Sequence, residues 1–597
     1  MNFRRFFALK RIEAQKLEPD RLHTIANATQ QSSSSAASFK SSSKSVGYSQ
    51  LHVKPSMEVP KLANNLDRVL FSPGVHFLKD PRTNVYNFPI MLENVMSIKD
   101  FDFSKIAQFV PGSKDAKLAR LALKHGKKYV GSTSSMTGLL CQLHMAISHD
   151  RLPHIMGLSK FFQGETTTFS RAQKSPALVN VRKEPTTGVY TIQSDATHDE
   201  ETILSLLGHL METMLVTDVD KFGRYRRGIS DMFFDGESSA AANAYHYLDA
   251  GRFLLRSQLD CYDPRLPGTG MFDLKTRAVC AVRHDIDYVQ IGDGSDYQIM
   301  RLDGYEESFA REYYELIRSA LFKYSLQARI GSMDGIFVAY HNVRTLFGFQ
   351  YLPLSEIDHI FHTSDLIEGG KFRTLDQKMH KIGSIIAKKE FSLSLQVLSD
   401  TLDTIISRMD GDGVNLAVLF TTNGKIAVVA KPMMEAHISN PRDMPEILAS
   451  EAEYRVGEDP YTLFQHYEKN KQFVPPDVRA FEVAITSSIN GKEVPLNEHP
   501  TLRSSRDEWT LNYSICEAKT PGDLYKKVMD QVLSSEKVTA PVLERTADEA
   551  GRRALSLAKL PEPTFLQKRL RALENKGEIY KAWDNARKKI AWKPSKL

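Results

Sequence analysis

Apolar residues recur at helical spacing in two long segments of the chain. Between residues 200 and 216 apolar residues at this spacing include Ile203, Leu206, Leu207, Leu210, Met214 and Leu215. Between residues 309 and 327 one helical stripe contains Phe309, Tyr313, Leu316, Ile317, Ala320, Leu321 and Tyr324. Residues three and four apart line one face of a helix. Each segment is therefore predicted to form a helix with one buried face.

Strand patterns lie between and after these two helices. Residues 254–262 and 271–279 read as two strands joined by a turn rich in Pro and Gly, and Ile336–Tyr340 reads as a buried strand. Further on, residues 375–409 look helical, and Asn-Gly pairs at 423–424 and 490–491 predict two hairpins. The order helix, strands, helix, strand predicts an α/β (α+β) fold with a mixed sheet flanked by helices.

Two acids and a lysine fall on the predicted strands. Asp273 and Lys275 are two residues apart, so they project from one face of their strand. The turn can bring Asp260, thirteen residues earlier, beside them. Carboxylate oxygens suit Mg²⁺ or Mn²⁺, and a nearby ammonium can stabilise charge that develops on a phosphate. This group predicts a metal-dependent phosphodiesterase.

An acid two residues before a lysine is by itself a weak signal. The same spacing occurs at Asp115/Lys117, Asp376/Lys378, Glu517/Lys519 and Glu574/Lys576. Most such pairs are solvated surface charges. The order of the predicted elements around Asp273 is what distinguishes this pair, because it is the order of the PD-(D/E)XK nuclease core.

Longer motifs strengthen this interpretation. The segments 235–239, 243–247, 256–261 and 272–278 together resemble the fungal mitochondrial RNA 5′-end-processing proteins. That family is a divergent branch of the PD-(D/E)XK nucleases and acts as a 5′-to-3′ exoribonuclease. The resemblance implies that Asp260, Asp273 and the carbonyl of Leu274 bind metal, and that Lys275 is catalytic.

Two further catalytic positions follow from the same resemblance. Related exonucleases carry an acid or a histidine on the first core helix, where Glu212 stands, with Glu237 as a rival. They also carry a glutamine on the second helix, which Gln327 matches, followed four residues later by a tyrosine. Gly331 takes that place here. A solvated helical carboxylate is the ordinary alternative for Glu212.

A segment that interleaves cations with aromatic residues lies just before the acidic cluster. Its members are Lys221, Phe222, Gly223, Arg224, Tyr225, Arg226 and Arg227. Bases of single-stranded RNA can stack on aromatic rings while arginines hold phosphates. We expect Lys221, Arg224, Tyr225, Arg226 and Arg227 to contact RNA.

The two ends of the chain differ in composition from the middle. Residues 1–50 combine a basic, apolar start with a Ser-rich stretch, as in a mitochondrial transit peptide followed by a disordered linker. The remaining regions are predicted as an N-terminal α/β region (51–195), the nuclease core (196–362), a C-terminal α+β region (363–535) and a basic helical tail (536–597). The tail could bind RNA, an acidic partner or a membrane surface.

Composition indicates the size of the core and argues against a membrane span and a disulfide framework. The chain has 597 residues, 42% of them hydrophobic, and a formal net charge of +6, so it can bury a large core. No apolar stretch approaches the roughly twenty residues of a membrane span. Four scattered cysteines, Cys141, Cys261, Cys280 and Cys516, indicate reduced core thiols rather than disulfides or a structural zinc site.

The sequence therefore predicts a Mg²⁺-dependent mitochondrial 5′-to-3′ exoribonuclease that processes and degrades RNA. Its expected location is the matrix, with peripheral association with the inner membrane. Single-stranded RNA is the expected substrate, and mitochondrial RNA polymerase or an RNA degradation complex the expected partner. Two alternatives remain open: a mitochondrial DNA exonuclease, and a nuclease-like binding factor that does not cut. RNA preference and 5′ polarity rest on the resemblance alone.

Overall fold

The computed structural model of the chain describes most of the sequence from residue 39 onward. The described residues are 39–43, 45–53, 58–107, 110–155, 158–194, 203–229, 243–290, 296–364, 377–421, 424–433, 474, 477–536 and 562–591. The predicted transit peptide and most of the Ser-rich linker lie outside them. The rest of this section concerns residues 40–597, which form one compact unit.

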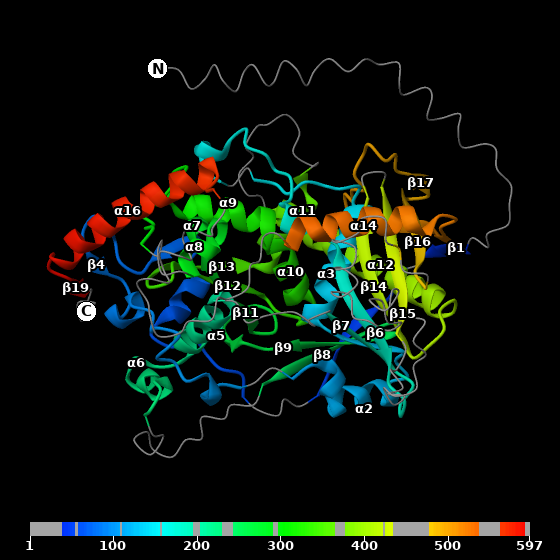
Figure 1. Cartoon of the computed structure of the whole chain (residues 1–597), viewed down its shortest axis with the longest axis horizontal. Helices are drawn as coiled ribbons and strands as arrows, with labels where there is room; N and C mark the ends of the chain where they lie inside the picture. The colour runs from blue at the N-terminus through cyan, green and yellow to red at the C-terminus, as the bar shows by residue number, and fades with distance from the viewer. Residues whose placement is uncertain are drawn as a thin grey trace, which may run out of the picture. The chain divides into compact units, whose positions relative to one another are not determined.

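The larger sheet of the described chain has twelve strands in the order β1-β18-β16-β15-β14-β6-β7-β5-β9-β8-β2, with β17 pairing β16 (Figure 1). Its strands are β1 (Phe39–Ser43), β2 (Tyr48–Leu51), β5 (Tyr129–Ser132), β6 (Ala177–Lys183), β7 (Tyr190–Ser194), β8 (Tyr245–Ala250), β9 (Phe253–Gln258), β14 (Gly413–Phe420), β15 (Lys425–Met433), β16 (Arg479–Ile489), β17 (Lys492–Glu493) and β18 (Trp509–Glu517). These strands come from four of the regions marked in the sequence, including the end of the Ser-rich linker, which supplies β1 and most of β2. Those regions therefore do not fold as separate sheets.

A smaller sheet carries the strand with Asp273 and Lys275. Its order is β10-β11-β12-β13-β3, made from β3 (Val75–Phe77), β10 (Cys261–Tyr262), β11 (Met271–Ala278), β12 (Gly335–His341) and β13 (Leu346–Pro353). β11 and β12 run parallel, whereas the other neighbours are antiparallel. The predicted mixed α/β class is confirmed.

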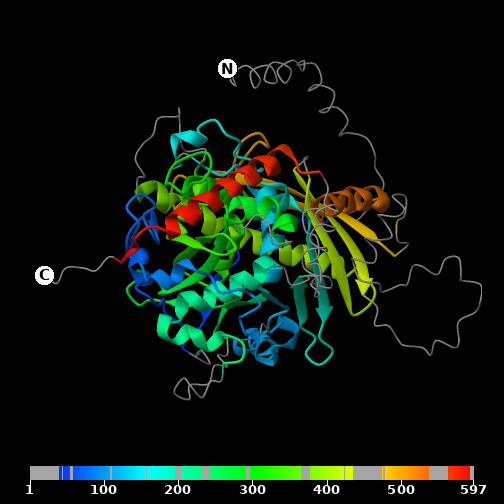
Figure 2. The same cartoon turned by 60° about the vertical axis from the view of Figure 1, so that its left-hand side comes forward.

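Helices cover both faces of each sheet. α3 (Thr133–Ile147) and α12 (Gln377–Ile406) pack on one face of the large sheet, and α2 (Ala116–Lys124) and α14 (Pro521–Glu536) pack on the other. The packing of α14 beside β15 is visible in Figure 2. α5 (Ile203–Val216) covers one face of the small sheet, while α9 (Phe309–Ser319), α10 (Leu321–Ile330) and α11 (Leu354–His362) cover the other.

Short elements complete the described chain. They are η2 (Leu66–Phe71), β4 (Val85–Tyr86), η3 (Ile90–Glu93), η4 (Phe103–Lys105), η5 (Gly112–Lys114), η6 (Lys160–Phe162), α4 (Arg171–Lys174), α6 (Val219–Phe222), η7 (Gly223–Tyr225), α7 (Cys280–His284), α8 (Ile286–Gln290) and β19 (Ile590–Ala591), together with the long C-terminal helix α16 (Phe565–Asn585). Among the described residues no helix is long and apolar enough to span a membrane. The four cysteines are unpaired thiols, as expected, and three of them are buried.

Two predictions from the sequence need correction. The segment 309–327 is not one helix, because the chain turns at Ala320 (φ −123°) and starts α10 at Leu321. β9 is not the partner of β11: it pairs with β5 and β8 in the large sheet, and only the two-residue β10 pairs with β11. The chain therefore crosses from one sheet to the other between Gln258 and Cys261.

The basic tail is also not a separate charged extension. α16 packs on α7, and its cations pair with acids of the core (Figures 1 and 2). The pairs are Arg569–Glu306, Arg571–Asp285, Lys576–Glu307 and Lys581–Asp296. The sequence missed this because the acids lie between 263 and 286 positions away from their partners.

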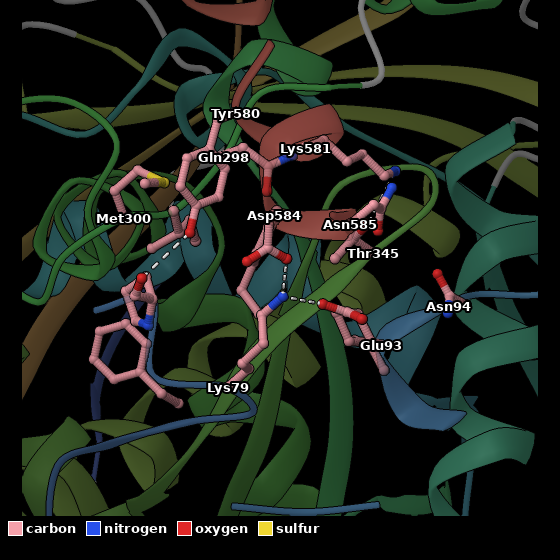
Figure 3. Close-up of a pocket in the computed structure, with 15 residues that line it drawn as sticks. Lys79, Glu93, Asn94, Gln298, Met300, Thr345, Tyr580, Lys581, Asp584 and Asn585 are labelled. Atoms are coloured by element: carbon pink, nitrogen blue, oxygen red, sulfur yellow. Dashed lines mark hydrogen bonds and ion pairs between the residues drawn. The ribbon is translucent and has the colours of Figure 1, made fainter. Parts of the chain in front are cut away.

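At the other end of α16, Lys79 lies between Asp584 of the helix and Glu93 of the core, with 2.6 Å from Lys79 Nζ to Glu93 Oε1 (Figure 3). Lys589 also pairs with Glu93, at 3.1 Å. We call these pairs, together with the four along α16, the α16 seam. It fastens the end of the described chain to the core.

Candidate active site

Asp260 lies where the chain crosses between the two sheets. β10 pairs with β11 only through Phe272 and Met271, so β11 has an open edge from Asp273 onward. At that edge the Leu274 N–H donates to Asp260 Oδ2 at 3.2 Å. The crossing therefore places a carboxylate against the strand that carries the other acid and the lysine.

Asp273 and Lys275 share one face of β11, as their spacing predicted. Lys275 Nζ lies 2.8 Å from Asp273 Oδ2 and donates to the Leu274 carbonyl at 3.1 Å. The same ammonium lies 5.5 Å from the centre of the Tyr324 ring on α10. Asp273 is only 4% exposed, so its carboxylate interacts with these neighbours in a poorly solvated setting.

Glu212 reaches the cluster from the helix on the opposite side of the strand. α5 packs closely on β11, where a Cβ added to Gly208 would lie 3.6 Å from Thr276 Oγ1. The Glu212 side chain is 34% exposed, and its Oε2 lies 3.9 Å from His209 Nδ1. Desolvation of the carboxyl and the charge of Asp273 raise the pKa of Glu212 to about 7, although Lys275 acts in the opposite sense. The rival Glu237 lies outside the described residues.

The cluster has more negative than positive charge. Burial and the neighbouring Asp273 and Glu212 carboxylates raise the pKa of Asp260 well above its usual value. The carboxylates of this cluster also raise the pKa of Lys275, although burial alone would lower it. Three carboxylates and one ammonium leave two negative charges when all are ionised, which a divalent cation would balance.

The donor set fits an oxygen-seeking metal ion. Asp273 Oδ2 is buried and accepts no hydrogen bond from the described residues, despite its ion pair with Lys275. Asp260 and the Leu274 carbonyl offer further oxygens at the same edge of β11. Mg²⁺ and Mn²⁺ both prefer such ligands. These residues could therefore hold either ion.

Two residues of α10 border this group. Tyr324, which the sequence interpretation did not single out, lies beside the Lys275 ammonium. Gln327 is three positions later, hence on the same helix face, and its Oε1 is buried without a hydrogen bond from the described residues. The signal that could have revealed Tyr324 is this spacing from Gln327.

The proposed RNA-binding segment has mixed exposure. Arg224 is 7% exposed, and Tyr225 stacks on Phe101 with ring centres 5.6 Å apart. Arg226 lies 3.5 Å from Asp100, and the Arg227 Nε donates to the Phe101 carbonyl. Lys221, Arg226 and Arg227 are exposed. Packing thus engages Arg224 and Tyr225, whereas RNA could reach the other three.

A second group of metal-ligand type lies on the far side of α10. His144, His362 and Glu390 are buried, and ligand atoms of all three lie within 4.8 Å of one another. Arg151 NH1 lies 3.8 Å from Glu390 Oε2 and brings a positive charge to the same carboxylate. Burial lowers the pKa of His144, which favours its neutral form. Arg151 and the two histidines surround Glu390, so this group has less excess negative charge than the acids on β11.

Comparison with known proteins identifies the family. The family model described as mitochondrial protein Pet127 matches residues 109–403. A Schizosaccharomyces pombe protein named mitochondrial mRNA degradation protein pet127 is 37% identical over 368 residues, which is 60% of this chain and 69% of that protein. The chain belongs to the Pet127 family. The resemblance that the motifs indicated and the mitochondrial location are confirmed.

A second Pet127 relative comes from Saccharomyces cerevisiae and is named for a role in the mitochondrial translation system. It is 39% identical over 384 residues, which is 58% of this chain but only 46% of that protein. The chain thus matches less than half of the length of this relative. Glu212, Asp260, Asp273 and Lys275 fall inside the range matched by the family model, whereas α16 falls outside it.

Two solved structures show a distant likeness to the chain. Scheffersomyces stipitis Rai1 in complex with (3′-NADP)+ and calcium ion is 11% identical with a TM-score of 0.28, covering 67% of this chain and 90% of that one. Kluyveromyces lactis (K. lactis) Dxo1 in complex with manganese is 10% identical with a TM-score of 0.29, covering 64% and 95%. At these values neither structure assigns an activity to this Pet127 chain.

Proposed function

We propose that this Pet127 protein is a metal-dependent 5′-to-3′ exoribonuclease of mitochondria. The observation that carries the proposal is the convergence of Asp260, Asp273 and Lys275 at the open edge of β11, with Glu212 of α5 near enough to feel their charges. Acids in excess over cations are costly to maintain, and such clusters are typical of functional sites. Asp273→Asn and Lys275→Ala should each abolish cleavage.

Each residue has a distinct role in the proposed reaction. Asp260, Asp273 and the Leu274 carbonyl would hold Mg²⁺ or Mn²⁺, which supplies Lewis-acid polarisation of the phosphate. The Lys275 ammonium stabilises negative charge that develops on the phosphate oxygens. Water adds to phosphorus, and Glu212 accepts the proton that water loses. The bond from phosphorus to the 3′ oxygen breaks, and that oxygen takes a proton from solvent water to leave as a hydroxyl. A pKa of about 7 suits Glu212 to that task.

The choice of RNA and of the 5′ end rests on the family. The S. pombe relative bears the name of an mRNA degradation protein, which supports RNA as the substrate class. Lys221, Arg226 and Arg227 are the exposed cations that would bind the strand or its terminal phosphate. Gln327 would position the substrate from α10. Association with mitochondrial RNA polymerase, a degradation complex or the inner membrane stays a prediction.

The test uses matched RNA and DNA strands that carry a 5′-monophosphate and a label at either end. With Mg²⁺ or Mn²⁺, we expect RNA to shorten from its 5′ end, and EDTA to stop the reaction. Circular RNA of the same sequence is the control for end dependence. Equal cleavage of circular and linear RNA would show that the protein is an endonuclease. Faster cleavage of DNA than of RNA would show that DNA is the substrate. No cleavage under any of these conditions would contradict the proposal that the protein is a nuclease.

A further inference from the structure

A cavity of about 440 Å³ opens beside the acidic cluster, where the two sheets meet. Its wall combines the end of β2, the start of β8, the start of β11 and the turn after α10. Two lining residues adjoin the site directly: Leu259 precedes Asp260, and Met271 lies two positions before Asp273 on the same strand face. Two residues along a strand span about 6.7 Å. The cavity is therefore immediately next to the candidate metal ligands.

The cavity has a composition that suits a flat, uncharged ligand. Its twelve lining residues include Tyr245, His246, Tyr247 and His52, and none of them is Lys, Arg, Asp or Glu. A phosphate would need cations in the wall, whereas a nucleobase needs aromatic faces and a few neutral polar groups. The volume lies in the range of about 300–1,000 Å³ that is typical of small-ligand sites.

Polar groups in the wall are held in place. The Tyr245 hydroxyl is buried and has no hydrogen-bond partner among the described residues, and the Arg256 guanidinium lies 4.3 Å from the centre of its ring. Arg256 is fixed in turn by Asp115 at 2.6 Å. His246 Nε2 lies 3.1 Å from Ser332 Oγ. Burial lowers the pKa of His246 to about 4, so the ring is neutral at physiological pH.

We propose that this cavity binds one nucleobase of the RNA strand, next to the phosphate that is cut. The inference rests on the proposed nuclease function, because the position of the cavity beside the acids is what relates it to a strand. The Tyr245 hydroxyl and the neutral His246 ring would contact the base edge. One base held there would set the register in which the neighbouring phosphate reaches Asp260 and Asp273.

The test pairs a change in the RNA with a change in the protein. RNA binding is measured by fluorescence anisotropy in EDTA, where the strand stays intact, for RNAs that lack the base at one of the first four nucleotides. In the wild-type protein, loss of the base at one position should weaken binding by about 5- to 150-fold, the value of stacking one base on an aromatic residue.

Two variants of an exposed wall residue complete the design. Gln50→Trp fills the cavity from its rim, and Gln50→Ala leaves it open. Filling should abolish the penalty for the missing base, because no base binds there, while Gln50→Ala should keep it. Tyr245→Phe, which removes only the hydroxyl, should reduce the penalty without abolishing it. Thermal unfolding of each variant confirms that it is folded.

The outcomes separate this inference from the proposed function. A missing-base penalty of the same size in the wild type and Gln50→Trp, or no penalty at any position, would overturn the base-binding cavity. Metal-dependent cleavage, measured separately on intact RNA, tests the enzyme itself. If the protein cleaves RNA but a missing base does not weaken binding, the nuclease function stands and the base-binding cavity does not. If a missing base weakens binding in the wild type but not in Gln50→Trp, and no RNA is cleaved, the cavity binds a base in a protein that binds RNA without cutting it.

Discussion

The acidic cluster on β11 and the α16 seam are both built from partly buried charges, yet their balance differs. In the seam, Lys79 lies between Glu93 and Asp584, and hydrogen bonds to Lys79 and Tyr86 lower the pKa of Glu93 despite its burial. In the cluster, burial and neighbouring acids raise the pKa of Asp260 and Glu212. The ion pairs of the α16 seam hold α16 on the core, whereas the acidic cluster keeps more negative than positive charge.

The difference shows what each charge contributes. A paired buried carboxylate is satisfied, so removing its partner leaves an uncompensated charge that is costly. An unpaired excess of carboxylates costs stability from the start, so removing one should relieve the fold and harm only the chemistry. Loss of function and loss of stability should therefore separate cleanly between the two regions.

Asp273→Asn should have the largest effect. Loss of a direct metal ligand should reduce cleavage by more than about 100-fold, since changes to residues that only support a ligand already cost about 10- to 100-fold. The metal-free variant should unfold at the same or a higher temperature than the wild type. Asp263→Asn is the matched control, because Asp263 is close in sequence but pairs with Arg265 at 2.5 Å. Cleavage by Asp273→Asn at the wild-type rate would show that Asp273 is not part of the catalytic site.

Lys79→Met in the α16 seam should lower stability, in contrast to Asp273→Asn, which should lower cleavage alone. Two buried carboxylates lose their shared cation, but Glu93 keeps Lys589 and Asp584 keeps Arg587. The free energy of unfolding should therefore fall by less than the ~3–5 kcal/mol that an uncompensated buried charge costs, and by more than in the control. The control is Arg569→Met, whose half-exposed pair with Glu306 should cost less than about 1 kcal/mol. Denaturant unfolding measures both. Equal costs for the two variants would mean that burial does not set the strength of the seam.

Gly577→Ala tests how closely α16 packs on the core, because it adds a methyl group and leaves every charge in place. A Cβ at this position would lie 2.1 Å from the Asp296 carbonyl oxygen, so α16 would have to move away from the core. We expect a loss of about 1–3 kcal/mol, as for other overpacked sites. Ala572→Ser on the exposed face of α16 is the control for helix propensity. An unchanged midpoint in Gly577→Ala would show that α16 is not tightly docked there.

The smallest effect concerns pH and one carboxyl of α16 that resembles the catalytic acids. Burial, followed by the charge of Asp285, raises the pKa of Glu574 to about 8. The folded state therefore holds this proton more tightly than the unfolded state. Its stabilisation is complete below the unfolded value of about 4.5 and is lost as pH rises through 8.

Glu574→Gln keeps a neutral side chain at every pH. Its unfolding free energy should fall less than that of the wild type between pH 5 and pH 9, since the glutamine has no proton to lose. Urea titrations across this range measure the two slopes. Parallel slopes would contradict the assignment of a raised pKa to Glu574.

The sequence by itself determined the local elements and the chemical groups. Periodicity predicted α5, β11, β12 and α12, and Asn-Gly predicted the turn at 490–491, where both residues have positive φ. These features depend on neighbours within a few positions. The Asp-x-Lys spacing likewise fixed which side chains share a face of β11.

Only the tertiary structure decided how distant segments meet. It separated β9 from β11 into different sheets, which turned the short crossing at Asp260 into the junction beside which the cavity forms. It also brought the cations of α16 onto acids that are hundreds of positions away, so a tail that looked like a free basic extension became a seam. Which strands and which charges pair depends on contacts between segments far apart in the chain. Local sequence propensity does not specify these partners.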